Sequence, residues 1–311
     1  MQTHTFRAMG SPCRIVADGG PEDLVADAHA LIGRLEQRWS RFLPGSEISH
    51  LNRNAGNVTL VSDETFGLIA RATEAQVLTG GRFNPLMLQQ LTEIGYDAPW
   101  QERVPGTTSA RRVDDQPRPA STEPIDLYPE INGVRLPGAT AFDPGGIGKG
   151  FAADLVTEFL TINGATCTSV ELGGDLRVSG ESWFDASWRI GVADPFDETK
   201  DIAAFSPVGG AVATSSTLRR CWIVDDERRH HLLDAATGRP AATDLVSVTA
   251  CSSVAWWAEI AAKVAVIEGS IGAIDLLHEF GTPGLAVAAD GSVRTTAPEA
   301  RVGTAEELAS A

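Results

Sequence analysis

A glycine-rich run ahead of an apolar stretch most restricts how this chain can fold. Residues 142–154 read FDPGGIGKGFAAD, with four glycines and Lys149 directly before an apolar helical pattern over residues 151–162. Glycines let the backbone approach a ligand closely, and a helix N-terminus presents N–H groups and positive potential to phosphate. The spacing is that of neither a P-loop nor a dinucleotide-binding GxGxxG. The run predicts a tight strand-to-helix turn or a phosphate site, and Lys149 favours the phosphate site.

The charge balance restricts the partners. The chain has 311 residues, 41 acidic and 25 basic side chains, and a formal net charge of -16. Nucleic acids and anionic membranes need basic patches that neutralise phosphate, so neither is an expected partner. Only three basic residues are lysines, namely Lys149, Lys200 and Lys263. The 43% of hydrophobic residues excludes a disordered chain and a coiled coil.

Targeting signals and cysteine spacing indicate the compartment. The first residues, MQTHTFRAMGSPCRIVADGG, contain no apolar run of a signal peptide or membrane anchor. No later stretch reaches the roughly 18 apolar residues of a membrane helix. The four cysteines are scattered and form no C-x-x-C pair, which favours isolated thiols over a zinc or disulfide framework. We therefore expect a cytoplasmic protein without membrane insertion.

The periodicity predicts an α+β (mixed α/β) fold, with mixed sheets flanked by helices in a single domain over residues 1–311. Residues 101–124 are polar and rich in Pro, Ser and Arg, which predicts an exposed insertion. Residues 298–311 are expected to be a loosely packed tail. We also expect a strand over residues 5–18 and strands near Ile131 and Val134. Helices are expected over residues 21–38, in a short stretch that begins near Ser46, and over residues 62–79, where Ser62 is the expected N-cap.

Two further segments carry glycines or hydroxyls. Residues 171–180 read ELGGDLRVSG, which is most simply a bend in a sheet at Gly173-Gly174-Asp175. Residues 211–220 read AVATSSTLRR and place four hydroxyl groups in a row, including Thr214 and Ser215. Such runs are usually turns or caps, and they are also good neutral donors to a diphosphate.

A histidine segment and an apolar helix complete the candidates. Residues 230–240, HHLLDAATGRP, form either a hairpin turning at Thr237-Gly238 or a site that uses His231 as a base. Residues 254–268 are apolar almost all round, which predicts a buried helix. Glu259 and Lys263 lie four residues apart on it. On a surface such a pair is a modest helix stabiliser, but in a buried helix it favours a role in a site.

Together these segments resemble the FAD:protein FMN transferase (ApbE-like) family, nearly end to end and in the family's order. The most specific match is DPGGIGKGFAAD to the family's D-L-G-G-I-A-K-G-Y-A-x-D. The other matching segments are Met9-Gly10-Ser11, SRFLPGSEISHLN with Phe42 in place of Tyr, GRFNP with Asn84 in place of Asp, ELGGD, ATSS, and HLLDAATGRP with Ala235 in place of Pro.

The resemblance implies a reaction and roles for residues. The family moves the FMN half of FAD onto a Thr or Ser hydroxyl of an acceptor flavoprotein and releases AMP. Catalysis would be mostly positioning and electrostatic stabilisation of a diphosphate. His231 would be the general base, with Asp234 as its neighbour. The FAD-binding residues implied are Met9, Phe42, Asn84, Gly145, Gly146, Lys149, Gly150, Gly173, Gly174, Asp175, Thr214, Ser215 and Lys263.

The sequence departs from the family at the metal. The family typically binds Mg²⁺ through a backbone carbonyl, equivalent here to that of Gly148, and through an Asp and a Thr four residues apart. The last pair aligns with Glu259 and Lys263. A Glu can ligate Mg²⁺, whereas a lysine only donates. Two alternatives follow: Lys263 replaces the metal in an active transferase, or the protein binds or hydrolyses FAD without transferring FMN.

Overall fold

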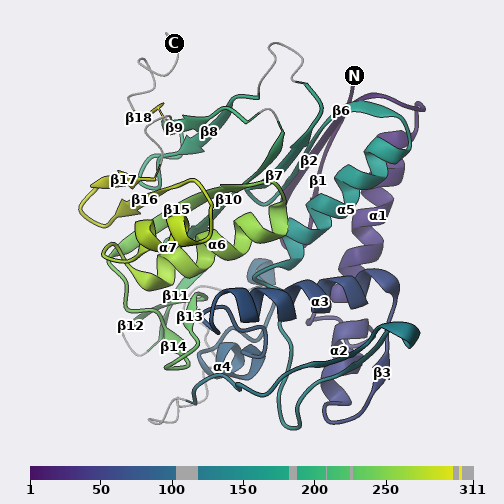
Figure 1. The fold of residues 1–311 in the computed structure, drawn as a ribbon, viewed down its shortest axis with the longest axis vertical. Coiled ribbons are helices and arrows are strands. Elements are labelled where there is room, and N and C mark those ends of the chain that lie inside the picture. The colour runs from purple at the N-terminus through teal and green to yellow at the C-terminus, as the bar shows by residue number, and fades with distance from the viewer. Residues whose placement is uncertain (103–117, 182–187, 208, 225–226, 297–300, 303–311) are drawn as a thin grey trace. The chain divides into compact units, whose positions relative to one another are not determined.

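Figure 1 shows the computed structural model, which describes residues 1–102, 118–181, 188–207, 209–224, 227–296 and 301–302. The chain divides into two compact units, each assembled from segments that are distant in sequence. Unit 1 comprises Met1–Ile32, Lys149–Leu218 and Ala242–Ala311, and unit 2 comprises Gly33–Gly148 and Arg219–Ala241. The single domain expected over residues 1–311 stays a prediction.

In the described part of the chain, unit 1 is built on an eight-stranded sheet in which every neighbouring pair is antiparallel. The α+β class is confirmed, and the strand directions are antiparallel instead of mixed. In spatial order the strands are β1 (Gln2–Ala8), β2 (Ser11–Gly19), β6 (Ala165–Leu172), β7 (Asp175–Ser179), β10 (Gly210–Ser216), β15 (Leu245–Ser252), β16 (Gly284–Ala288) and β17 (Val293–Thr295).

The first two strands correct one expectation. The sequence predicted a single strand over residues 5–18, but β1 and β2 form a hairpin in which Ala8 faces Ser11. The two residues between them, Met9 and Gly10, both have positive φ, at 49° and 73°. A two-residue turn of this kind matches the twist of the flanking strands and usually carries Asn-Gly or Gly-Gly. The methionine hid the turn, because bulky residues rarely adopt a positive φ.

Helices cover one face of this sheet. The expected helices are confirmed as α1 (Leu24–Trp39), α5 (Gly148–Ile162) and α6 (Ala255–Glu268), followed by α7 (Ala273–Glu279). The α6 helix packs on β10 and β15, and most of its residues are buried, as predicted. None of the helices in the described part of the chain has the length and apolar character needed to span a bilayer.

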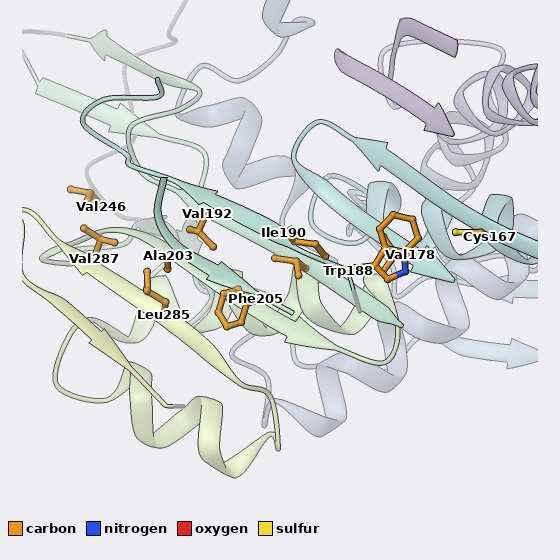
Figure 2. Close-up of a cluster of buried hydrophobic side chains, with 11 residues drawn as sticks. Cys167, Val178, Trp188, Ile190, Val192, Ala203, Phe205, Val246, Leu285 and Val287 are labelled. Atoms are coloured by element: carbon orange, nitrogen blue, oxygen red, sulfur yellow. The ribbon is translucent and has the colours of Figure 1, made fainter. Parts of the chain in front are cut away.

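A small sheet covers the opposite face. It consists of β8 (Ile190–Ala193), β9 (Asp201–Phe205) and β18 (Arg301–Val302). The neighbours Arg177 and Val178 on β7 point to opposite faces. Arg177 pairs with Asp154 of α5, whereas Val178 packs against the small sheet. The buried cluster between the two sheets, drawn in Figure 2, contains Cys167, Val178, Trp188, Ile190, Val192, Ala203, Phe205, Val212, Val246, Leu285 and Val287.

Among its described residues, unit 2 contains the long helix α3 (Asp63–Leu78) and the two short helices α2 (Glu47–Arg53) and α4 (Leu88–Glu93). The predicted N-cap Ser62 is confirmed, and Ser46, near which a helix was expected to begin, is the N-cap of α2. The hydroxyl of Ser46 accepts the Ser49 N–H at 3.0 Å, and that of Ser62 accepts the Thr65 N–H at 3.4 Å. Each bond satisfies a backbone donor that the first helical turn leaves unpaired.

Short strands and 3₁₀ turns complete unit 2. The strand predicted near Val134 is present, whereas Ile131 lies in a 3₁₀ turn that begins at Pro129 and ends at left-handed Asn132. Proline disfavours a strand there because it lacks a backbone donor. The remaining elements are β3 (Thr59–Leu60), β4 (Asp126–Tyr128), β5 (Gly133–Arg135), β11 (Cys221–Val224), β12 (Glu227–His230), β13 (Leu233–Asp234), β14 (Arg239–Pro240), η1 (Trp100–Glu102) and η2 (Pro129–Ile131).

The two segments expected at the surface are only partly described. Residues 103–117 of the expected insertion over 101–124 lie outside the described residues. Beyond them Ala120 is buried, and its N–H donates to the Ala235 carbonyl at 2.9 Å, whereas Arg118, Pro119 and residues 122–124 are exposed. Of the expected tail over 298–311, only Arg301–Val302 is described, and its backbone pairs with β9.

Candidate active site

Two tight turns lie side by side at one end of the large sheet in unit 1. Met9-Gly10 joins β1 to β2, and Gly173-Gly174 joins β6 to β7. Because Cys13 pairs with Leu172, the two turns are neighbours, and the Gly173 N–H donates to the Pro12 carbonyl at 2.9 Å. The predicted bend at 173–175 is therefore confirmed, and it lies beside the Met9 turn.

Gly173 is required at this position for two reasons. Its φ is +65°, a conformation that favours glycine. A Cβ there would lie 2.7 Å from the Ser11 Cβ and 3.5 Å from Lys149 Cδ. The turn thus contacts both the start of β2 and the stem of Lys149, which brings two of the predicted segments together within unit 1.

Lys149 is held by two carboxylates. Its ammonium pairs with Asp175 and lies 3.3 Å from Glu259 Oε1. The side chains of Asp175 and Glu259 are only 2% and 6% exposed, and that of Lys149 is 18% exposed. Buried carboxylates are costly unless they are paired, so the Lys149 ammonium compensates part of the charge of these two acids. A role for Lys149 in phosphate binding has to coexist with these ion pairs.

Gly150 lets α5 and α6 approach closely. A Cβ there would lie 2.5 Å from the Ala255 carbonyl oxygen and 2.9 Å from the Trp256 Cα. The Gly150 N–H donates to Glu259 Oε2 at 2.8 Å. Gly150 therefore allows the two helices to pack and holds the Glu259 carboxylate. These two roles account for a glycine at this position without a bound ligand.

Asp154, for which no role was predicted, caps α6 from the neighbouring helix. Its two carboxylate oxygens accept the N–H groups of Ala255 and Trp256 at 2.8 and 2.9 Å. Val254, the residue at the N-cap position, supplies no side-chain cap. Arg177 pairs with Asp154 at 3.2 Å and completes this arrangement. Asp154 follows Lys149 by five residues in the same helix, but a cap supplied by a different helix leaves no local sequence signal.

The predicted hydroxyl donors lie on opposite faces of the sheet. Val212 faces Leu176 across the β7–β10 pairing, and Val212 belongs to the cluster under the small sheet. Side chains alternate along a strand, so Thr214 points to that same face and Ser215 to the face of Asp175 and Arg177. Thr214 also shares a 2.9 Å hydrogen bond with Thr249. Ser215 is the better placed of the two relative to Lys149.

In unit 2 the glycine turn before α5 is fastened by two residues that sequence reasoning missed. Asn52 exchanges two hydrogen bonds with the Phe142 backbone, at 3.0 and 2.7 Å. Arg41 lies 3.0 Å from Asp143, and both side chains are largely buried. Both residues lie in the segment SRFLPGSEISHLN, so its match to the family was the signal that could have found them.

The turn itself is compact. The Gly148 N–H donates to the Pro144 carbonyl at 2.8 Å, Gly146 is buried, and a Cβ on Gly145 would lie 3.0 Å from Asp143 Oδ2. The run was expected to form a strand-to-helix turn or a phosphate site. A tight turn directly before α5 is present, but no strand leads into it, because the preceding strand, β5, ends at Arg135. Phosphate binding stays a prediction.

An aromatic group surrounds Arg41. Its guanidinium carbon lies 4.3 Å from the Phe42 ring centroid and 4.7 Å from that of Tyr96, and these rings meet edge to face at 6.1 Å. Such cation–π contacts hold a planar side chain rigidly. Asn84 uses both ends of its amide within the fold, donating to the Ser121 carbonyl at 2.8 Å and accepting the Leu86 N–H at 2.9 Å.

The histidine segment forms a hairpin, one of the two alternatives that the sequence left open, with β13 and β14 joined across Thr237-Gly238. Asp234 Oδ1 accepts the Ala236 N–H at 2.9 Å, which shapes the turn. His231 is half-buried, and its ring lies 6.5 Å from that of Tyr96. Burial lowers the pKa of the adjacent His230, whose Nδ1 accepts the Leu232 N–H at 3.3 Å.

The residues present do not fit the resident Mg²⁺ that the resemblance implies. Both oxygens of Glu259 are already used, one by the Gly150 N–H and one by the Lys149 ammonium. Lys263, one turn further along α6, offers no lone pair. Within the described ranges no group of three or more His, Cys, Asp or Glu side chains could hold a metal ion. The Gly148 carbonyl alone does not make a site for a cation that prefers octahedral oxygen ligands.

Comparisons with known proteins agree on one family. The model of the ApbE family matches residues 9–288. A Klebsiella pneumoniae (strain 342) protein named FAD:protein FMN transferase is 29% identical over 251 residues, or 79% of this chain and 75% of that protein. A Treponema pallidum (strain Nichols) protein of the same name is 28% identical over 274 residues, or 81% and 73%.

Solved structures share the fold. The ApbE protein of Thermotoga maritima MSB8 superimposes with a TM-score of 0.83 at 25% identity, covering 95% of this chain and 96% of that one. The apo flavinyl transferase ApbE of Pseudomonas stutzeri superimposes with a TM-score of 0.77 at 22% identity, covering 95% and 94%. With a family model that spans most of its length, this chain belongs to the ApbE family.

Proposed function

We propose that this protein transfers the FMN moiety of FAD to a Thr or Ser hydroxyl of an acceptor flavoprotein and releases AMP. The observation that carries the proposal is the family match over residues 9–288, both units included. The Klebsiella pneumoniae and Treponema pallidum relatives, which align with about four-fifths of the chain, bear the name of this activity.

The reaction is a phosphoryl transfer. The acceptor hydroxyl oxygen forms a bond to the phosphorus on the flavin side of FAD, and the bond from that phosphorus to the bridging oxygen breaks. AMP leaves with the bridging oxygen, and the hydroxyl proton passes to a base. The products are the flavin phosphoester and AMP, so atoms and charge balance. Positioning and electrostatic stabilisation of the diphosphate supply most of the catalysis in such reactions.

The residues at the end of the large sheet are suited to the diphosphate. Gly173-Gly174 brings bare backbone to the surface beside Lys149, and Ser215 adds a hydroxyl on the same face as Asp175. We assign Met9, Phe42 and Asn84 to the flavin and ribose side, as the resemblance implies. The 145–150 turn would hold phosphate with its backbone, because Lys149 is shared with two carboxylates.

His231 is the proposed base for the acceptor hydroxyl. It is half-buried and its Nδ1 is enclosed by the fold, so Nε2 is the nitrogen that would take the proton of an acceptor hydroxyl. Asp234 would act as a positioning residue, because its carboxylate fastens the turn that follows His231. A histidine suits this task because its ordinary pKa lies near neutral pH.

The proposal is tested by incubating the protein with FAD and a candidate acceptor and measuring AMP release and acceptor mass. We expect AMP and a mass gain of one FMN moiety in equal amounts. His231→Asn should abolish the gain, and the exposed His278→Asn is the matched control. FAD binding or AMP release without any mass gain would instead support an FAD-binding or FAD-hydrolysing protein, the alternative that Lys263 motivates.

The same proposal includes a cytoplasmic location. The structure contains no disulfide among Cys13, Cys167, Cys221 and Cys251. Burial raises the pKa of the Cys251 thiol to about 12, which makes it unreactive. Cysteines that form no disulfide suit a reducing compartment.

A further inference from the structure

The ion-pair group around Lys149 leaves this end of the sheet short of positive charge. Lys149 contributes one positive charge, whereas Asp175 and Glu259 contribute two negative charges, and all three side chains are buried or nearly so. The group therefore carries a net charge of -1. An anionic diphosphate is repelled by such a group unless another cation compensates it.

Lys263 is the next cation along α6. It lies one helical turn after Glu259, and residues four apart on a helix have Cβ atoms about 5–6 Å apart. Its neighbours Ala262 and Val264 are buried, whereas Lys263 is half-buried. With Lys263 the four-residue group is neutral, and a lysine ammonium is a compact charge able to bind phosphate.

A divalent cation is disfavoured at the same position. It would have to compete with Lys149 for the Glu259 carboxylate and with Gly150 for the second oxygen. It would also be bound one helical turn from Lys263, whose positive charge repels it and whose ammonium supplies no ligand. The two lysines that disfavour a metal ion here, Lys149 and Lys263, therefore also supply positive charge in its place.

We propose that the Lys263 ammonium replaces the divalent cation at this site, so that the protein handles the FAD diphosphate without a resident metal ion. The consequence for catalysis rests on the proposed FMN transfer. The absence of a bound metal ion does not rest on that transfer, so metal binding can be measured separately.

The first experiment measures metal binding with Mn²⁺ as the probe, by electron paramagnetic resonance, with and without FAD. We expect no FAD-dependent Mn²⁺ site in the wild type and a new site in Lys263→Thr and in Glu259→Asp/Lys263→Thr, which restores an acid–threonine pair. Lys200→Thr is the control, because Lys200 is exposed and pairs with Asp197. A Mn²⁺ site in the wild type would overturn the proposal. Absence of a site in both Lys263 variants would overturn the role given to Lys263.

The second experiment measures AMP release and acceptor mass in Mg²⁺ or in a chelator. Wild-type rates should differ by less than twofold. Lys263→Thr should be at least tenfold slower in the chelator and recover in Mg²⁺, whereas Lys263→Met, which offers no oxygen ligand, should be slow in both. Chelator-sensitive wild-type activity would overturn the proposal. If no variant transfers FMN under any condition, the proposed function fails, and the Mn²⁺ measurement still decides the inference.

Discussion

Met9 is a bulky residue held in a left-handed backbone conformation, with φ at 49°. Such a conformation costs about 1–3 kcal/mol and tends to persist at functional sites. Met9→Gly should therefore raise the free energy of unfolding by roughly 1 kcal/mol, after the entropic cost of glycine is subtracted. Chemical denaturation measures it, with Gly10→Ala, at φ 73°, as the control that should destabilise.

The same variant also tests the assignment of Met9 to FAD. If its side chain contacts the flavin, Met9→Gly should bind FAD more weakly although it is more stable. Titration of flavin fluorescence measures the affinity. A variant that is more stable and binds FAD as tightly as the wild type would restrict Met9 to shaping the turn.

His230 makes the stability depend on pH. Burial lowers its pKa below the ordinary value of 6.5, and its Nδ1 accepts a backbone N–H, which requires the neutral ring. The unfolded chain thus binds the proton more tightly, so this stabilisation is present above pH 6.5 and is lost as the pH falls through the folded pKa. We expect the free energy of unfolding to rise from pH 5 to 7, by at most about 1.4 kcal/mol per pH unit for one group.

The measurement is chemical denaturation across that pH range. His230→Gln should flatten the slope, whereas the exposed His278→Gln should leave it unchanged. An unchanged slope in His230→Gln would show that other groups cause the acid sensitivity.

Single residues were predictable where their type alone restricts the chemistry. Lys149 was predicted as a site residue because lysine is rare in this chain, and Gly173 was predicted in a bend because glycines favour turns. Their partners were not predictable. Asp175 and Glu259 are 26 and 110 residues away from Lys149, so only the folded sheet and helices bring the three together. The sequence suggested that Lys149 is available to bind phosphate. The structure shows its ammonium already paired with two carboxylates.

Among the helices, α6 depends on a cap from its neighbour. The Asp154 carboxylate accepts the first N–H groups of α6 and pairs with Arg177. Asp154→Ala should lower the free energy of unfolding by roughly 2 kcal/mol, since caps contribute about 1 kcal/mol each and the half-buried Arg177 loses its partner. Asp154→Asn keeps one acceptor and should cost less. Chemical denaturation measures both, with the exposed turn residue Asp290→Ala as control, and equal losses in all three would contradict the cap.

Elements with a local signal were predicted well. The helices that begin after Ser46 and Ser62 carry a capping hydroxyl, and α6 has an apolar run long enough to exclude a strand. The β1–β2 hairpin was missed because Met9 occupies a glycine-like position. Strand order was also beyond prediction, since β10 lies between β7 and β15 only through long-range pairing.

At the scale of the whole molecule, the resemblance predicted the family and the α+β class, whereas the division into two units was not foreseen. Each unit is assembled from segments that a stretch of the other unit separates in the sequence, and α1 contributes to both. No change of composition marks such a division, because the chain crosses from one unit to the other within helices or at short turns. A linker-based search for boundaries therefore cannot find it.

The total charge leads to a prediction about FAD binding. A chain of net charge -16 repels an anionic dinucleotide at long range, whereas any positive pocket acts only locally. Salt shortens the Debye length to about 10 Å at 0.1 M and should screen the repulsion more than the buried contacts. FAD association should therefore accelerate, by roughly twofold or more, between 0.02 and 0.15 M salt. Stopped-flow flavin fluorescence measures this rate, with uncharged riboflavin as the control. A rate that falls with salt would mean that the local field around Lys149 and Lys263 outweighs the charge of the whole chain.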